Sequence, residues 1–251
     1  PADAMPAIVQ RFHAVEPAQK VDALAQLLVS ERAEQALVFC NMRRDVDTLA
    51  RELDRRGFSA LALHGDMDQR DRDEVLVRFA NHSCAVLVAT DVAARGLDIV
   101  DLPLVVSYDV AHDPQTHTHR IGRTGRAGQS GLAITLCTSN ERAKAANIEE
   151  MLQSPLPWHP LKVAVNRDKV LHLAPMQTLV IDAGRQHKLR PGDILGALTG
   201  DAGLQADAVG KIDIFPTRSY VAIKRAAAGK AWQRLRAGRI KGRDFRIRRL
   251  G

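Results

Sequence analysis

The sequence of 251 residues predicts an α/β protein in which a parallel sheet flanked by helices is followed by a smaller βαββαβ domain. In the first 150 residues, short β-branched runs alternate with amphipathic stretches, which is the pattern of βαβ units in a parallel sheet. After a proline-rich stretch the order of the expected elements changes to βαββαβ. The length also fits two domains better than one.

The expected elements of the first domain follow one another in a regular order. Apolar runs predict strands at Ala36–Cys40, Ala60–Leu63, Ala85–Ala89, Leu104–Tyr108 and Leu132–Cys137. Amphipathic spacing predicts helices at Lys20–Ser30, Asp45–Arg56, Gln69–Phe79, Thr116–Arg120 and Asn140–Leu152. This order fits a doubly wound sheet, whose binding loops lie beyond the carboxyl ends of the strands.

The segment from Ser154 to Pro175 contains four prolines, which predicts a linker or a strand that wraps around the outside. We therefore expect domains at residues 1–153 and 177–251, joined by a linker at 154–176. The second domain has expected strands in Thr178–Gly184, Gly210–Pro216, Ser219–Lys224 and Asp244–Leu250, and expected helices in Arg190–Gly200 and Ala226–Leu235. This layout is that of the RNA-recognition-motif (RRM) fold, although unrelated ferredoxin-like domains share it.

The positive charge of the chain is concentrated in its C-terminal third. Residues 1–160 hold 17 Lys and Arg against 22 Asp and Glu, a balance of −5, whereas residues 161–251 hold 19 against 7, a balance of +12. Concentrated charge of this sign attracts polyanions, and nucleic-acid phosphate is the most common such partner. A merely solubilising surface is the alternative, and the concentration of the charge disfavours it.

Several other classes of protein are disfavoured. The sequence has no apolar run long enough to span a bilayer, so no membrane partner is expected, and its first residues do not resemble a secretory signal. Cys40, Cys84 and Cys137 lie far apart among apolar residues, which predicts buried thiols in a reducing cytoplasm and no metal site. Pro1 stands where an initiator methionine would stand, which indicates a fragment of a longer protein.

The stretch HRIGRTGRAG, from His119 to Gly128, interleaves three arginines with three glycines. Glycine lets the backbone bend sharply, so the guanidinium groups can converge on one point. The fork-shaped and permanently charged donors of arginine suit phosphate oxygens. A solvated run of charge is the alternative, but such a run does not require the interleaved glycines.

The stretch ATDVAARGLDI follows directly on the apolar strand AVLVA and therefore lies where a binding loop is expected. Thr90 offers a hydroxyl group, Arg95 a cation and Gly96 a close backbone approach. Asp98 offers an acceptor that suits a ribose hydroxyl. Taken alone, each residue also fits a cap or a turn, and Asp91 fits the cap of a short helix.

Four segments together resemble the ordered motif set of the second RecA-like domain of DEAD-box RNA helicases. They are ALVFCNMRR (Ala36–Arg44), LHGDMDQRDRDEVLVRF (Leu63–Phe79), ATDVAARGLDI (Ala89–Ile99) and HRIGRTGRAG (His119–Gly128). The resemblance covers most of residues 6–152. It implies that the first domain is one RecA-like half of an ATP-dependent RNA motor, whose cofactor is ATP with Mg²⁺ held by an N-terminal RecA-like domain.

The resemblance also implies a role for each matching residue. Arginine fingers that meet the γ-phosphate across the cleft would be Arg123 and Arg126. Asp98, together with Gly96, would bind the nucleotide at its ribose. His119 and Arg120 would connect the cleft with the other motor domain. The RNA sugar–phosphate backbone would be contacted, without regard to base sequence, by Thr90, His64, Gly65, Arg70 and Arg95.

The motifs that bind the phosphates and the metal in such motors are absent from this sequence. No GxxxxGK[ST] phosphate loop and no Asp-Glu-Ala-Asp motif occurs in the 251 residues. Without the lysine of that loop and the acidic metal site, this half cannot assemble the reaction centre. We expect the isolated chain to have negligible ATPase activity.

The stretches RPGDILGALTGDAGL, GKIDIF, SYVAIK and IKGRDFRIRRL resemble the C-terminal RNA-binding domain of DbpA-type helicases, over about residues 177–251. This resemblance implies a hairpin of large-subunit ribosomal RNA as the target, remodelled during ribosome assembly.

RRM domains stack bases on aromatic residues of two strands, but the matching strands here contain only Tyr220. Trp232 shares a helical face with Ala228, Ala231 and Leu235, which favours core packing. The expected RNA contacts are Lys188, Arg190, Lys211, Arg218, Tyr220, Lys224, Arg225, Arg243, Arg246 and Arg248.

Two other functions compete with this hypothesis. A non-catalytic RNA-binding anchor accounts for the basic tail but not for paired arginines beside a cleft. A DNA helicase of the same superfamily shares the arginine fingers. The residues of the motifs HRIGRTGR and ATDVAARGLDI, together with the βαββαβ domain, favour RNA as the substrate.

Overall fold

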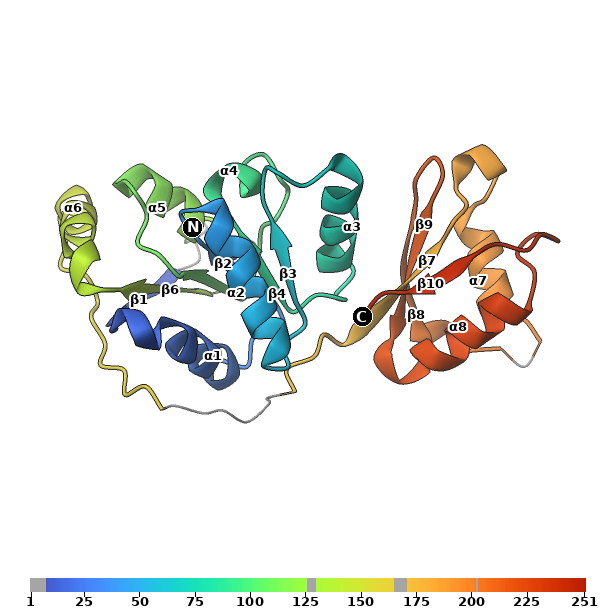
Figure 1. The fold of residues 1–251 in the computed structure, drawn as a ribbon, viewed down its shortest axis with the longest axis horizontal. Helices are drawn as coiled ribbons and strands as arrows, with labels where there is room; N and C mark the ends of the chain where they lie inside the picture. Colours follow the sequence, from blue (N-terminus) through green and yellow to red (C-terminus); the bar gives the residue numbers. More distant parts are fainter. Residues whose placement is uncertain (1–7, 126–129, 165–170, 202) are drawn as a thin grey trace, which may run out of the picture. The chain divides into compact units, whose positions relative to one another are not determined.

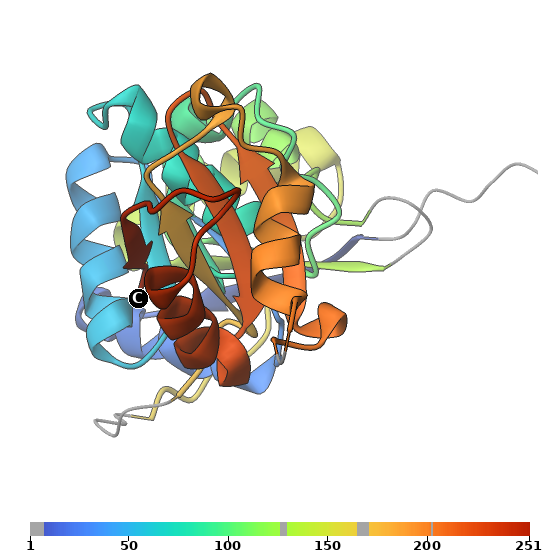
Figure 2. The same cartoon turned by 90° about the vertical axis from the view of Figure 1, so that its right-hand side faces the viewer.

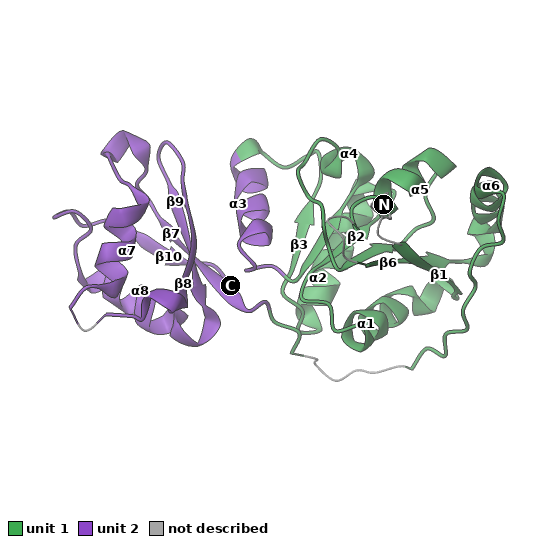
Figure 3. Cartoon of the chain, turned by 180° about the vertical axis from the view of Figure 1, so that it is seen from behind, with its two compact units in different colours: residues 1–69, 85–173 green, residues 70–84, 174–251 purple. Residues whose placement is uncertain are grey.

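The computed structural model describes residues 8–125, 130–164, 171–201 and 203–251. The chain forms two compact units, each with its own sheet (Figure 1). Unit 1 contains residues 1–69 and 85–173, and unit 2 contains residues 70–84 and 174–251 (Figure 3). No helix in these described ranges has the length and apolar character needed to cross a bilayer.

Unit 1 is built on a six-stranded sheet with the order β1-β6-β5-β2-β4-β3, in which every strand pair is parallel. The strands are β1 Ile8–Ala14, β2 Ala36–Phe39, β3 Ala60–Leu63, β4 Val86–Ala89, β5 Leu104–Ser107 and β6 Gly131–Cys137. Strands β2, β4 and β5 are buried along their whole length. Helices cover both faces of a parallel sheet, which explains why these strands are uninterrupted apolar runs. The predicted parallel sheet is confirmed.

The helices of unit 1 are α1 Lys20–Ser30, α2 Arg43–Arg55, α4 Asp91–Ala94, α5 Pro114–Ile121 and α6 Arg142–Leu152. Figure 1 shows α1 and α5 on opposite sides of the sheet. Helix α2 buries Val46, Leu49, Ala50 and Leu53. Their spacing of three and four residues makes one apolar stripe, while the remaining positions of the helix are mainly charged.

Two elements of unit 1 are missing from the sequence-based prediction. Strand β1 is the edge strand beside β6, and its sequence IVQRFHA mixes polar and apolar residues without a clear period. Helix α4 has four residues, which is little more than one turn and too short to show a helical period.

The described part of the proline-rich segment runs along unit 1. The amide of Phe12 in β1 donates to the carbonyl of Pro157 at 2.9 Å, and the amide of His159 donates to the carbonyl of Phe12 at 2.9 Å. The rings of Phe12 and Trp158 are 5.6 Å apart. Further along, the side chain of Gln26 in α1 bonds to the backbone of residues 162 and 164. The segment therefore adds a short outer strip beside β1, as one of the two predicted alternatives describes.

Unit 2 contains a four-stranded antiparallel sheet with the order β10-β7-β9-β8. The strands are β7 Met176–Ile181, β8 Val209–Ile214, β9 Ser219–Lys224 and β10 Ile247–Arg249, and the helices are α7 Pro191–Thr199 and α8 Ala228–Ala237. Helices α7 and α8 lie together on one face of this sheet (Figure 2). The order βαββαβ is confirmed.

The core of unit 2 lies between this sheet face and the two helices. Strand residues such as Leu179 and Val221 pack there against helix residues such as Ile194 and Leu235. Trp232 packs against the same core, so its predicted core role is confirmed. Cys40, Cys84 and Cys137 are buried, as predicted.

The opposite face of the unit 2 sheet is covered by residues of α3, which spans Gln69–Ala80. Val77 of α3 packs against Val180 of β7 and Tyr220 of β9. The side chains of Asn81 and Ser83, just after the helix, share hydrogen bonds of 3.0 and 2.8 Å with the hydroxyl group of Thr178. Along the chain α3 connects β3 with β4, as predicted. The sequence does not predict that α3 packs on the sheet of unit 2, because an apolar stripe does not specify which surface covers it.

Candidate nucleotide and RNA sites

The two motif loops of unit 1 begin at the carboxyl ends of neighbouring parts of one parallel sheet. Strand β4 ends at Ala89 and continues into α4, and strand β5 ends at Ser107 and continues toward α5. Both strands pair with β2, so their carboxyl ends lie at the same edge of the sheet. Ligands of doubly wound sheets bind at this edge.

These loops enclose a hollow of about 710 Å³. Its lining includes the predicted residues Arg95, Gly96, Asp98, His119 and Arg123. Gly96 has a φ of +75°, a conformation that favours glycine, and it turns the chain back between Arg95 and Asp98. The side chains of Arg95, Asp98 and His119 are exposed. The structure thus places a cation, an exposed carboxylate and an imidazole around one open hollow.

Thr90 begins helix α4 and is not part of the hollow. Its hydroxyl oxygen accepts a hydrogen bond from the amide of Ala93 at 3.2 Å, and the residue is buried. Thr90 is therefore the N-cap of the helix, and Asp91 occupies the first helical position. The alternative in which Asp91 caps the short helix is not what the structure shows.

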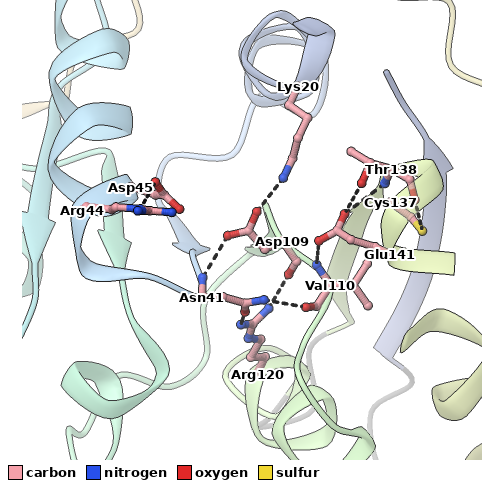
Figure 4. A network of polar contacts seen from close by, with 10 residues as sticks. All are labelled: Lys20, Asn41, Arg44, Asp45, Asp109, Val110, Arg120, Cys137, Thr138 and Glu141. Atoms are coloured by element: carbon pink, nitrogen blue, oxygen red, sulfur yellow. Dashed lines mark hydrogen bonds and ion pairs between the residues drawn. The ribbon is translucent and has the colours of Figure 1, made fainter. Parts of the chain in front are cut away.

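Arg120 is fully buried, with 0 % of its surface exposed. Its guanidinium group donates from Nε and Nη2 to the two carboxylate oxygens of Asp91, each at 2.7 Å. It also donates to Asn41 Oδ1 and to the carbonyl of Asp109, both at 2.6 Å (Figure 4). The contact of Arg120 with another motor domain stays a prediction, and in this structure the side chain has no exposed surface. Arg120 fixes the start of α4.

The bonds of Arg120 belong to a larger polar network at the carboxyl edge of the sheet (Figure 4). Asp109 accepts from Lys20 Nζ at 2.6 Å and from the amide of Asn41 at 2.9 Å. Glu141 accepts from the amide of Val110 at 3.0 Å and from the amide of Thr138 at 3.0 Å. The network therefore ties α1 and α5 to the ends of β2, β5 and β6, and it holds the floor of the hollow rigid.

Arg123 lies just after α5, beyond its C-cap Gly122, and lines the hollow. Its Nη1 donates to the carbonyl of Leu97 at 2.7 Å and to that of Ile99 at 3.3 Å. The guanidinium group thus joins the α5 motif to the loop that carries Asp98. Arg126, the second predicted finger, lies outside the described residues.

Asp113 and His117 shape the helix that presents His119 and Arg123. Asp113 is the N-cap of α5, and its carboxylate accepts from the amide and the hydroxyl group of Thr116 at 2.8 and 2.9 Å. The hydrogen bond from the Thr116 amide lowers the pKa of Asp113. On the buried side of the helix, Nε2 of His117 lies 2.9 Å from Gln10 Oε1.

The remaining predicted RNA contacts of the motor domain do not line the hollow. His64 is buried, with Nε2 2.9 Å from Asp47 Oδ2 and Nδ1 accepting from the amide of Asp66 at 3.3 Å. Gly65 is exposed, and Arg70 is exposed in the first turn of α3. His64 therefore holds the turn in place while Gly65 presents its backbone.

The predicted RNA contacts of unit 2 fall into two groups. The exposed group contains Lys188, Arg190, Lys211, Lys224, Arg243 and Arg246. Arg218 pairs with Glu74 and Asp182 at 3.6 and 3.8 Å. Arg225 donates to the carbonyls of residues 174 and 176, and Arg248 pairs with Asp182 at 3.5 Å. These three arginines are thus engaged inside unit 2.

Tyr220 is buried to 2 % exposure in unit 2. Its ring meets that of Phe215 edge-on at 5.5 Å, and burial raises the pKa of its hydroxyl group. The contact of Tyr220 with RNA stays a prediction, and in this structure the residue packs against Val77 of α3 and is buried.

Sequence reasoning missed a basic groove between α7 and α8. The groove measures about 720 Å³, and Lys230, Arg234 and Arg239 line it. The available signal was the spacing of the glycines, which places Gly192 and Gly196 on one face of α7 and Gly200 directly after its end.

Comparison with known families assigns both units. The description "Helicase conserved C-terminal domain" matches residues 19–128. The description "DbpA RNA binding domain" matches residues 178–249. The first match contains the hollow and both motif loops, and the second contains the antiparallel sheet with α7 and α8. The fold and the site therefore define the C-terminal half of a helicase motor with an appended RNA-binding domain.

Comparison with individual proteins specifies the type of helicase more closely. The chain is 50 % identical over 248 residues to the ATP-dependent RNA helicase DbpA of Escherichia coli, a match that covers 99 % of this chain and 54 % of that protein. A crystal structure of the E. coli DEAD-box protein SrmB bound to RraA matches with a TM-score of 0.59 at 32 % identity, covering 65 % of this chain and 98 % of that one. Saccharomyces cerevisiae Dbp5 bound to RNA and ADP BeF3 matches with a TM-score of 0.57 at 30 % identity, covering 61 % of this chain and 41 % of that one.

The chain belongs to the DEAD-box family of RNA helicases and, within it, to the DbpA type. It spans about half the length of the E. coli DbpA protein.

Proposed function

We propose that this chain is the C-terminal part of an ATP-dependent helicase that remodels large-subunit ribosomal RNA during ribosome assembly. The observation that carries the proposal is the hollow in which Arg123, Asp98 and Gly96 meet at the carboxyl edge of the sheet. This half would supply charge for ATP hydrolysis and contacts to the RNA backbone. The second unit would deliver the motor to a hairpin of ribosomal RNA, since a tethered domain raises the local concentration of its target.

The residues of the hollow fit one side of an ATP molecule. Asp98 is an exposed acceptor suited to ribose hydroxyls, and Arg123 supplies a cation that suits phosphate oxygens. No acidic pair suited to Mg²⁺ accompanies them in the lining of the hollow, where Asp91 is taken up by Arg120. We infer that Mg²⁺ and the remaining phosphate contacts come from an N-terminal RecA-like domain, the second partner of this chain.

We propose a distinct task for each of several residues of this half. Arg120 holds Asp91 and thereby the α4 loop, so the loop keeps its shape when phosphate charge approaches. Arg123 is placed by carbonyls of the same loop, and its permanent charge would stabilise charge that develops on the phosphates. Exposed Gly65, Arg70 and Arg95 are the proposed contacts to RNA phosphates, and His119 is the proposed contact to the other motor domain.

The test of this function uses the full-length protein. Replacing Arg123 by alanine is expected to lower kcat of the RNA-stimulated ATPase by about 100-fold or more, because an arginine finger acts mainly in the transition state. Arg55→Ala is the matched control, since Arg55 is exposed on α2, does not line the hollow and pairs with Glu52 on its own helix. Undiminished ATP hydrolysis by the Arg123→Ala protein would refute the proposed role.

A non-catalytic RNA anchor is the alternative function. It predicts RNA binding without any effect of Arg123 or Asp98 on ATP turnover, so the same assay separates the two. The three buried thiols fit a reducing compartment, and we propose the cytoplasm as the place of action.

A further inference from the structure

The face of the unit 2 sheet on which an RRM normally stacks bases is closed. Thr178, Val180, Tyr220 and Ala222 are the central residues of β7 and β9 on that face, and none of them is more than 2 % exposed. Val77 of α3 lies on Val180 and Tyr220, and Arg218 beside them pairs with Glu74 of α3. RNA therefore has to meet unit 2 on another surface.

Helices α7 and α8 lie on the other face of the sheet (Figure 2). The groove between them is rich in cations. Lys230, Arg234 and Arg239 line it, together with the polar Gln233 and a single acidic residue, Asp201. In the described part of the chain, Lys230 makes no ion pair or hydrogen bond. Arg239 meets Asp244 only at 3.8 Å, with both side chains largely exposed, so this pair restrains it little.

Arg234 gives the groove a fixed positive floor. Its guanidinium group donates to the carbonyls of Ala197 at 2.8 Å, Gly200 at 2.6 Å and Asp201 at 3.0 Å. Ala197 lies in the last turn of α7, where carbonyls lack partners inside the helix, and Gly200 and Asp201 follow directly after it. Because these carbonyls are dipoles and not charges, the full positive charge of Arg234 remains available to an anion in the groove.

Gly196 is a second and independent indication that a ligand approaches helix α7 closely. It stands inside α7 and borders the groove, and a Cβ atom placed on it would meet no atom within 4 Å. Glycine inside a helix costs about 1 kcal/mol relative to alanine. Nothing in the described chain requires the missing Cβ, so the space over Gly196 suits a partner whose backbone approaches the helix directly.

We propose that the α7–α8 groove is the surface on which unit 2 binds the sugar–phosphate backbone of its RNA target, an inference that rests on the proposed function. Lys230 and Arg239 would contact phosphates, and Gly196 would allow the RNA strand to lie against α7. A backbone track of this kind positions the RNA without the aromatic stacking that the closed sheet face rules out.

The first test removes charge. The full-length protein carrying Lys230→Ala and Arg239→Ala is titrated with the large-subunit ribosomal hairpin over a range of salt concentrations. Loss of two phosphate contacts is expected to weaken binding about tenfold or more at moderate salt and to reduce the salt slope by about one to two. The control is Arg51→Ala with Arg55→Ala, which removes two exposed charges from helix α2, neither of them an expected RNA contact, and is expected to bind as the unchanged protein does.

The second test adds one methyl group. Gly196→Ala fills open space and improves helix propensity, so thermal unfolding is expected at an equal or higher temperature, while affinity for the hairpin drops several-fold. Gly229→Ala is the matched control, because Gly229 lies inside α8 away from the groove and its added Cβ would meet only the tip of Arg249, at 3.9 Å. That control is expected to leave the affinity unchanged.

The outcomes distinguish a failure of the groove assignment from a failure of the proposed function. Weaker binding by both groove variants, with both controls intact, supports the groove. Full affinity of both groove variants overturns the groove and leaves the proposed function standing. Failure of the unchanged protein to prefer the hairpin over a scrambled RNA overturns the proposed RNA target, and the groove assignment fails with it.

Discussion

Arg120 illustrates how a motif residue can serve a site without touching a ligand. Its guanidinium group donates to both oxygens of Asp91, to Asn41 and to the carbonyl of Asp109, and it stacks 5.1 Å over the ring of Phe39. Lysine could not reproduce these bonds, because its ammonium group is a single point of charge. The sequence marks the residue as part of an arginine-rich motif, but burial is a property of the fold that the motif alone does not contain.

Replacing Arg120 by methionine is expected to lower the free energy of unfolding of unit 1 by about 3 kcal/mol or more, because Asp91 would keep a partly buried charge without its partner. Arg120→Lys retains a charge and is expected to lose less. Urea unfolding followed by circular dichroism measures both variants. The control is Arg44→Ala, which removes a side chain that is 80 % exposed and is expected to change stability by less than about 1 kcal/mol. An unchanged midpoint for Arg120→Met would contradict the structural role.

The lowered pKa of His117 predicts that the stability of the protein depends on pH. Burial and the charge of Arg120 lower the pKa of His117 from 6.5 to about 4. The unfolded chain therefore binds a proton near pH 6.5 that the folded protein binds only near pH 4. Stability from this group is complete above pH 6.5 and falls as the pH drops toward 4, by about 3 kcal/mol in total.

His117→Gln is expected to flatten this dependence, which urea midpoints at about pH 7 and about pH 5 would show. Burial also lowers the pKa of His13. That group is present in both proteins, so the difference between them isolates His117. Equal slopes in the two proteins would show that His117 does not carry the effect.

At the scale of elements, strands and longer helices follow from the sequence pattern, whereas short and edge elements do not. The bounds of α1 and β9 agree with the prediction to the residue. Strand β1 and helix α4 are missed, because each depends on its neighbours more than on its own period. The same limit applies to α3, whose apolar stripe is visible but whose covering surface is not.

The packing of α3 on the sheet yields a prediction for Tyr220. Tyr220→Leu keeps an apolar side chain in the contact with Val77 and Val180. We expect a moderate loss of stability and unchanged affinity for the ribosomal hairpin, because the ring faces α3 and not the RNA. A base-stacking role would instead cost about 1–3 kcal/mol of binding energy. Hairpin titration together with thermal unfolding distinguishes these cases.

At the scale of the whole molecule, the two parts of the chain differ in net charge, which is −5 for residues 1–160 and +12 for residues 161–251. The motifs predicted which loops of unit 1 meet, since the carboxyl ends of parallel strands share one edge. The surface used by unit 2 was not predictable in this way. Arginines such as Arg225 and Arg248 look like RNA contacts in the sequence, yet their donors are engaged within the unit.

The chain taken alone should not be an ATPase. Arg123 and Asp98 line the hollow that we propose as one wall of the nucleotide site, but the 251 residues contain neither a phosphate loop nor an Asp-Glu-Ala-Asp motif. We expect the isolated chain to hydrolyse ATP at less than about a thousandth of the full-length rate, even with saturating hairpin RNA, because positioned phosphates and metal provide most of the acceleration. Adding the N-terminal motor domain in trans should restore RNA-stimulated turnover, which a phosphate-release assay measures. The same addition with the Arg123→Ala chain should restore far less, and robust turnover by the chain alone would show that a complete site exists within these residues.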